Sequence, residues 1–110
     1  MPVSHAINQW ENFPGWELIA EGLVDVSAAR VTPAACAIWI ALPRLRRAHL
    51  VDDGVLDRRI EEPETVLYRL LRKEGGDAFS RYNAILRRLV RFEHALDRGR
   101  HSDPRQSLAL

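Results

Sequence analysis

The chain has 110 residues, of which 46% are hydrophobic and 28% are charged, with a formal net charge of +1. This length is typical of one domain, and the apolar fraction is sufficient for one core without disulfides or bound metals. The composition excludes an intrinsically disordered chain, which lacks the apolar residues that offset the entropy lost on folding. The basic residues are unevenly chosen, because Lys73 is the only lysine and the other fifteen are arginines. Arginine makes planar, bidentate contacts with phosphate and carboxylate groups that lysine cannot make.

The N-terminal sequence and the single cysteine predict a cytoplasmic protein. Cys36 is the only cysteine, so neither an intrachain disulfide nor a zinc site built from several cysteines is expected. The first residues lack the basic and apolar segments of a signal peptide. The longest apolar run covers residues 34–42, which is far shorter than the roughly 20 residues needed to cross a bilayer. We therefore expect no contact with a membrane.

Residues 1–15 read as an N-terminal arm that turns into a first helix at about residues 16–29. Within this segment, Gly22 predicts either a close approach by a neighbouring helix or a locally weak helix, since glycine costs about 1 kcal/mol relative to alanine in a helix. The helix itself is predicted from apolar residues that recur on one face. They are Trp16, Ile19, Ala20, Leu23 and Val26.

A second helix is predicted from Pro33 to about residue 50. Thr32 can cap free backbone N–H groups, and proline is well suited to the first helical position. Residues 34–42 are apolar on every side, which predicts burial among neighbouring helices or at a subunit contact. Pro43 cannot donate the helical hydrogen bond to the Trp39 carbonyl, so a kink or break is expected there. A possible basic patch follows it, made by Arg44, Arg46 and Arg47.

Two further helices are predicted in the second half of the chain. Residues 51–62 form a connector in which the sequence leaves open a short strand or one helical turn. The third helix begins at Pro63 and ends with Lys73, before a pair of glycines. The fourth begins after the N-cap residue Asp77 and ends at about Arg98, before Gly99. Its apolar residues are expected to form one broad core face. They are Phe79, Tyr82, Ile85, Leu86, Leu89, Val90, Phe92 and Leu96.

These elements predict an all-α fold, a compact antiparallel bundle of about four helices with the apolar second helix at its centre. The bundle domain is expected to cover residues 16–99. Residues 100–110 read as a flexible C-terminal tail.

A basic row on the fourth helix is the most specific candidate site in the sequence. Arg87, Arg91, His94 and Arg98 recur at helical spacing and lie within about 60° of arc opposite the apolar face. Like charges four residues apart destabilise a helix by a few tenths of a kcal/mol, so the row calls for a reason. Either acids on another helix neutralise it, or it binds an anion such as nucleic-acid phosphate or an acidic protein.

The segment Arg87-x6-His94 resembles the closely spaced Arg and His pair of the HEPN ribonucleases. The resemblance covers about eight residues, and the family's usual downstream pattern is absent. It implies a helical bundle in which the Arg and the His act on RNA at a dimer seam. Their spacing puts both side chains on one helical face, as such chemistry requires.

A helix-turn-helix is a further alternative. Here the third helix, the Gly75-Gly76 turn and the fourth helix would present polar side chains to a DNA major groove. The length of the fourth helix and its apolar content speak against it. The presented residues would be Ser80, Arg81, Asn83 and Arg87.

No catalytic set is recognisable, and we expect no metal site and no cofactor. The sequence therefore favours a non-catalytic helical module that binds another macromolecule. A small bacterial regulatory protein, an antitoxin-like protein or a subunit of a complex would fit. The partner is expected to be another protein or a second copy, bound through an apolar helix surface. The alternative is a nucleic-acid-binding protein that uses the basic row, including a HEPN-like ribonuclease.

Overall fold

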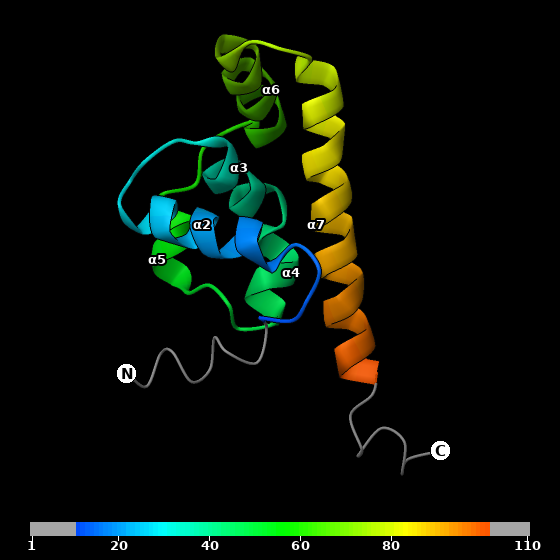
Figure 1. Ribbon diagram of the computed structural model, residues 1–110. Coiled ribbons are helices and arrows are strands. Elements are labelled where there is room, and N and C mark those ends of the chain that lie inside the picture. Colours follow the sequence, from blue (N-terminus) through cyan, green and yellow to red (C-terminus); the bar gives the residue numbers. More distant parts are fainter. Residues whose placement is uncertain (1–10, 102–110) are drawn as a thin grey trace.

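The computed structural model describes residues 11–101, with the side chains of residues 53, 56 and 99–101 left out. All regular secondary structure in this part of the chain is helical, as the sequence predicted (Figure 1). Most of the predicted arm and tail lies outside the described residues. The helices are α2 (Trp16–Ser27), α3 (Pro33–Ile40), α4 (Leu42–Arg47), α5 (Asp53–Asp57), α6 (Pro63–Glu74) and α7 (Ala78–His101).

Helix α2 begins at the predicted residue and ends two residues earlier than expected. Its Gly22 is buried against α3, and a Cβ atom there would overlap the Ala34 carbonyl oxygen and lie 2.5 Å from Cγ1 of Ile38. Real Cβ atoms do not approach that closely. Of the two interpretations of this glycine, the close approach of a neighbouring helix is therefore the one observed.

The predicted second helix is two helices, α3 and α4, separated at Ala41. Thr32 caps α3 as expected, because its Oγ1 accepts a hydrogen bond from the Ala35 N–H at 3.1 Å. The break precedes Pro43, which occupies the first turn of α4, where its missing N–H leaves no helical bond unmade. Helix α4 ends at Arg47, so a single helix reaching residue 50 is wrong.

The connector between α4 and α6 contains the short helix α5, which settles the choice between a strand and a helical turn. It is tied to the end of α2 by Arg58, whose Nη1 donates hydrogen bonds to the carbonyls of Val26 at 2.9 Å and Ser27 at 2.7 Å. These carbonyls lie in the last turn of α2, and the Val26 carbonyl also accepts a backbone hydrogen bond from the Ala29 N–H at 3.0 Å. The arginine therefore caps α2 and anchors the connector.

Helices α6 and α7 form a hairpin with both predicted starts confirmed. Asp77 caps α7 by accepting a hydrogen bond from the Ser80 N–H at 3.1 Å, and this bond, together with one from the Ser80 hydroxyl, lowers the pKa of the Asp77 carboxyl. The predicted end of α7 before Gly99 is wrong, because the helix continues to His101. Glycine weakens a helix interior without obliging the helix to end.

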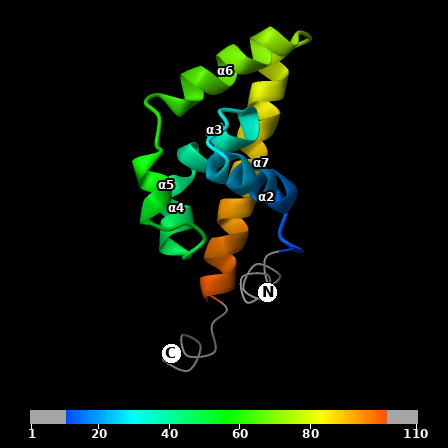
Figure 2. The same cartoon turned by 90° about the vertical axis from the view of Figure 1, so that its left-hand side faces the viewer.

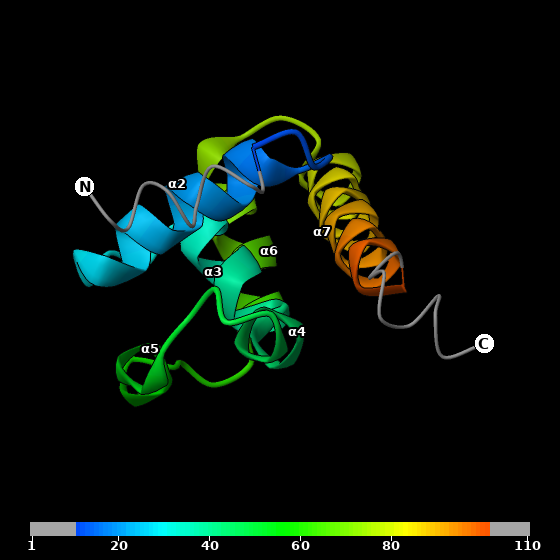
Figure 3. The same ribbon diagram turned by 90° about the horizontal axis from the view of Figure 1, so that it is seen from below.

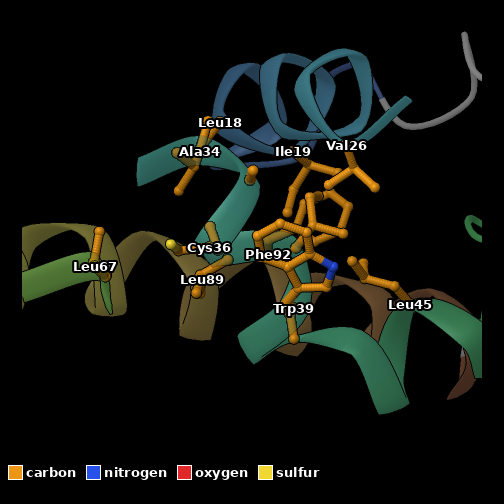
Figure 4. Close-up of a cluster of buried hydrophobic side chains, with 14 of the residues drawn as sticks. Leu18, Ile19, Val26, Ala34, Cys36, Trp39, Leu45, Leu67, Leu89 and Phe92 are labelled. Atoms are coloured by element: carbon orange, nitrogen blue, oxygen red, sulfur yellow. The ribbon is translucent and has the colours of Figure 1, made fainter. Parts of the chain in front are cut away.

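The core gathers around α3, whose residues from Ala34 to Trp39 are all buried. Figure 4 shows Phe92 of α7 beside Trp39, with Ile19 and Val26 of α2 on one side and Leu45 of α4 on the other. Cys36 is fully buried in the same cluster, and burial raises its pKa to about 11. The side chains in this cluster come from α2, α3, α4, α6 and α7.

The arrangement of the helices differs from a simple antiparallel bundle, which is not confirmed. Helix α2 lies across α3 and runs across the direction of α7 (Figures 1 and 2). Helix α3 packs against α2, α4, α6 and α7. Viewed from below, α7 stands at one side of the molecule with its outer surface turned away from the other helices (Figure 3). None of the described helices is both long enough and apolar enough to span a bilayer.

Candidate functional site

The basic row predicted on the fourth helix lies on the solvent side of α7. All four residues are exposed, whereas Leu89, Phe92 and Leu96 on the same helix are buried. At roughly 100° per residue, the two sets point in opposite directions from the helix axis. We call this surface the basic ridge, and it consists of Arg87, Arg91, His94 and Arg98.

Most of the ridge is not neutralised by the rest of the fold. Within the described part of the chain, Arg87, Arg91 and His94 form neither an ion pair nor a hydrogen bond. Arg98 does interact with another group. The interpretation in which acids from another helix neutralise the row therefore does not apply to Arg87 and Arg91, two positive charges one turn apart.

In the second predicted basic patch, Arg44 is paired with acids of α7 and adds no free charge to the ridge. The fold does bring α4 alongside α7, but Arg44 is directed to acids there: its Nη1 lies 2.8 Å from Oδ2 of Asp97, and its Nε lies 3.8 Å from Oε2 of Glu93. Its charge is thus largely balanced. Arg46 and Arg47 are exposed on the same short helix, and Arg46 also has an interacting group.

Two acidic residues of α7 were missed by the sequence interpretation. Glu93 and Asp97 lie four residues apart on a flank of the helix next to the ridge. Burial raises the pKa of the Glu93 carboxyl, and the nearby Arg44 guanidinium partly opposes that shift. Their spacing on one face was visible in the sequence, but the partner on α4 was not.

The predicted broad core face of α7 is wrong at two of its residues. Phe79 has 64% of its surface exposed and Val90 has 46%, while Leu86 between them is only partly buried. The face that packs into the core is therefore narrower than the apolar pattern of the helix. It leaves apolar side chains in contact with solvent beside the ridge.

An aromatic hollow borders this exposed apolar surface near the start of α7. Tyr68 of α6 and Tyr82 of α7 meet edge to face, with ring centroids 5.7 Å apart. The hollow has a volume of about 380 Å³. The side chains that line it come from both helices of the hairpin. They are Glu64, Thr65, Tyr68, Phe79 and Tyr82.

The residues of the helix-turn-helix alternative are engaged in local contacts. Arg81 forms an ion pair with Glu74 and donates a hydrogen bond to the Gly75 carbonyl at 3.0 Å. Ser80 donates to Asp77 as part of the helix cap. Two of the four side chains meant to reach a major groove thus stabilise the turn between α6 and α7.

A buried acid elsewhere in the molecule has a structural role. Asp25 of α2 accepts a hydrogen bond from the Thr32 hydroxyl at 2.6 Å and from Nη2 of Arg30 at 2.9 Å. These two bonds lower the pKa of the Asp25 carboxyl. The cluster ties the end of α2 to the start of α3. In the part of the chain that the structure describes, no group of three potential metal ligands comes together.

Comparisons with known proteins give no further guide to this surface. No protein-family model, curated protein sequence or solved structure matches the chain.

Proposed function

We propose that this protein is a non-catalytic helical module that works by binding another protein through the outer surface of α7. One observation carries the proposal. The unneutralised residues Arg87 and Arg91 lie on the same helix as the exposed apolar residues Phe79 and Val90. Exposed apolar side chains beside fixed charge are typical of protein interfaces, where an apolar centre is bordered by polar residues.

Nucleic-acid binding through the basic ridge is the second candidate. The unpaired charges of Arg87 and Arg91 support it, because arginine binds phosphate oxygens without regard to sequence. The exposed Phe79 and Val90 favour a protein over a nucleic-acid duplex, whose backbone offers no apolar surface to cover them, although unpaired bases can stack on an aromatic ring such as Phe79. In the HEPN-like form of this candidate, Arg87 and His94 would act on RNA together.

The biological role that we propose is regulatory. A module of 110 residues with one binding helix suits an antitoxin-like protein or a small subunit of a bacterial complex. We propose a cytoplasmic setting for it, because a fully buried single thiol is compatible with a reducing compartment.

Two variants and two matched controls test the proposal. Arg87→Gln/Arg91→Gln removes the two unpaired arginine charges of the basic ridge, and Val90→Ser removes an exposed methyl pair. The controls are Arg59→Gln/Arg69→Gln and Val24→Ser, which change exposed residues of the same types on other elements. Proteins are cross-linked to each form in an extract of the source cells and identified. Each captured protein is then purified and its affinity for every form is measured.

A purified partner that binds the parent and both controls, and binds both α7 variants at least about tenfold more weakly, supports the proposal. Partners that bind all five forms equally would overturn it. Parallel titrations with RNA and DNA oligonucleotides at low and moderate salt address the second candidate. If the parent binds these oligonucleotides in a salt-sensitive way and only the arginine variant loses that binding, the ligand of this surface is nucleic acid and not a protein. RNA cleavage abolished by His94→Ala would point to the ribonuclease.

A further inference from the structure

Exposed and partly buried apolar residues of α7 form a continuous stripe. Leu86 and Val90 are one turn apart, and Phe79 lies two turns before Leu86, so all three fall on one flank of the helix. Tyr82 packs against the core and lines the aromatic hollow together with Phe79. We call these four residues the apolar stripe. Two members, Phe79 and Val90, are the most exposed large apolar side chains of the helix.

The basic ridge runs along the edge of this stripe. Val90 is three residues after Arg87 and four residues before His94, so both are its direct neighbours on the helix surface. Arg91 continues the ridge one turn after Arg87. A partner that covers the stripe must therefore pass within reach of these positive groups.

Both ends of the surface are set by neighbouring helices. At its start, Phe79 faces the aromatic hollow shared with Tyr68 of α6. Beyond Val90, the same flank is occupied by the ion pair between Asp97 and Arg44. Between these limits the stripe runs from Phe79 to Val90, eleven residues along the helix, which corresponds to about 16 Å or three helical turns.

We propose that the occupant is an acidic amphipathic helix of about three turns from a partner protein, lying along the apolar stripe. This inference rests on the proposed function and specifies the chemistry of the partner. Apolar side chains spaced by one or two turns on the partner would cover Phe79, Leu86 and Val90. Aspartate and glutamate on the adjoining edge of the partner helix would face Arg87 and Arg91.

A second copy of this chain is a poorer occupant. If two α7 helices paired antiparallel through their stripes, their basic ridges would lie at the same edge of the interface. Arg87 and Arg91 of each copy would then face like charges, which is unfavourable where water is excluded. Charge complementarity thus favours an acidic partner over self-association.

The first experiment selects peptides on the full-length protein. The probe is a displayed library of four-turn helical peptides with all positions varied. We expect the enriched sequences to carry apolar residues at helical spacing, with aspartate or glutamate along one neighbouring edge. Counter-selection against Phe79→Ser/Val90→Ser removes peptides that bind elsewhere. Because Phe79 and Val90 are exposed, this variant is expected to fold normally, which circular dichroism checks.

The second experiment compares one selected peptide with its charge-reversed twin by fluorescence anisotropy. We expect the acidic peptide to bind the parent at least about tenfold more tightly than the twin. Arg87→Gln/Arg91→Gln should erase that preference, whereas the control Arg59→Gln/Arg69→Gln should keep it. Added salt should weaken the binding of the acidic peptide to the parent, since exposed charges are screened.

Three results would overturn the inference: enrichment of basic peptides, absence of any peptide that depends on Phe79 and Val90, or equal binding of the twin peptides. Self-association by light scattering that Val90→Ser abolishes would assign the stripe to a second copy instead. These results leave open that a cross-linked protein partner binds through α7. In that case the proposed function would stand, but the partner would have a different chemistry. Equal partner binding by all variants, by contrast, would remove the proposed function itself.

Discussion

Helices α3 and α7 place apolar residues in opposite ways. In α3, the eight residues are apolar throughout, and the six from Ala34 to Trp39 are buried by helices on every side. Helix α7 has 24 residues, with only a narrow face in the core and an exposed basic ridge opposite. A short helix that is apolar on all sides must be buried in the core, whereas a long amphipathic helix has a flank whose burial depends on its neighbours. The flank of α7 that its neighbours do not cover is the candidate binding surface.

Removing an aromatic ring from each side of α7 should give the largest contrast. Phe92→Ala should lower the free energy of unfolding by about 4 kcal/mol, because this fully buried ring stacks on Trp16 and leaves a cavity. Phe79→Ala should cost less than about 0.5 kcal/mol, because most of that ring is already in solvent. Urea unfolding followed by circular dichroism measures both. Equal losses would show that Phe79 belongs to the core.

Adding one methyl group to α2 should reveal how tightly α3 is enclosed. Helix propensity alone predicts that Gly22→Ala raises stability by about 1 kcal/mol. We expect a loss of about 2 kcal/mol instead, since the new Cβ would overlap the backbone of α3 at Ala34 and the side chain of Ile38. The measurement is the shift in the thermal unfolding midpoint of Gly22→Ala relative to the parent. A raised midpoint would mean that α2 and α3 can move apart at little cost.

The Asp25 cluster that holds the start of α3 should make stability depend on acid. The pKa of the Asp25 carboxyl is lowered in the folded state. Its contribution to the free energy of unfolding is therefore fully present above the ordinary pKa of about 3.9, and it is lost as the pH falls through the folded pKa. At pH 7, Asp25→Asn should cost about 1 to 2 kcal/mol through weaker bonds from Thr32 and Arg30. The difference from the parent should shrink as the pH falls below that value. A constant difference in urea unfolding across pH would contradict this assignment.

The smallest effect is expected on the basic ridge. Arg91→Gln should stabilise the protein by a few tenths of a kcal/mol at low salt, because it relieves repulsion from Arg87 one turn away. The gain should disappear at high salt, where exposed charges are screened. The control Arg59→Gln should not show this salt-dependent gain. A loss of stability on replacing Arg91 would mean that the ridge supports the fold.

Local signals in the sequence predicted the all-helical class and most of the helix starts, but not how the helices are arranged. Thr32, Pro63 and Asp77 marked helix starts correctly, because a cap involves side chains and backbone only a few residues apart. Gly22 marked a close helix crossing, although the sequence left a second interpretation open. The continuation of α7 past Gly99 was not predicted, since a single glycine costs too little to end a long helix.

The candidate surface could be predicted only in part. Helical spacing alone placed the basic ridge opposite the core face, so its exposure followed directly from the sequence. The exposure of Phe79 and Val90 did not follow, because both have the spacing of core residues and only the positions of α4 and α6 leave them uncovered. The ion pair of Arg44 with Asp97 depends likewise on contacts between residues far apart in the chain.

The burial of Cys36 makes it a built-in reporter of core opening. It is the only thiol in the sequence, it has no exposed surface, and its raised pKa keeps it protonated at neutral pH. A thiol reagent can therefore label the protein only when the helices around α3 separate and the group meets solvent. The labelling rate would time that opening without any added probe. Slower labelling in the presence of a bound peptide would show that binding at the solvent side of α7 makes opening of the core around α3 less frequent.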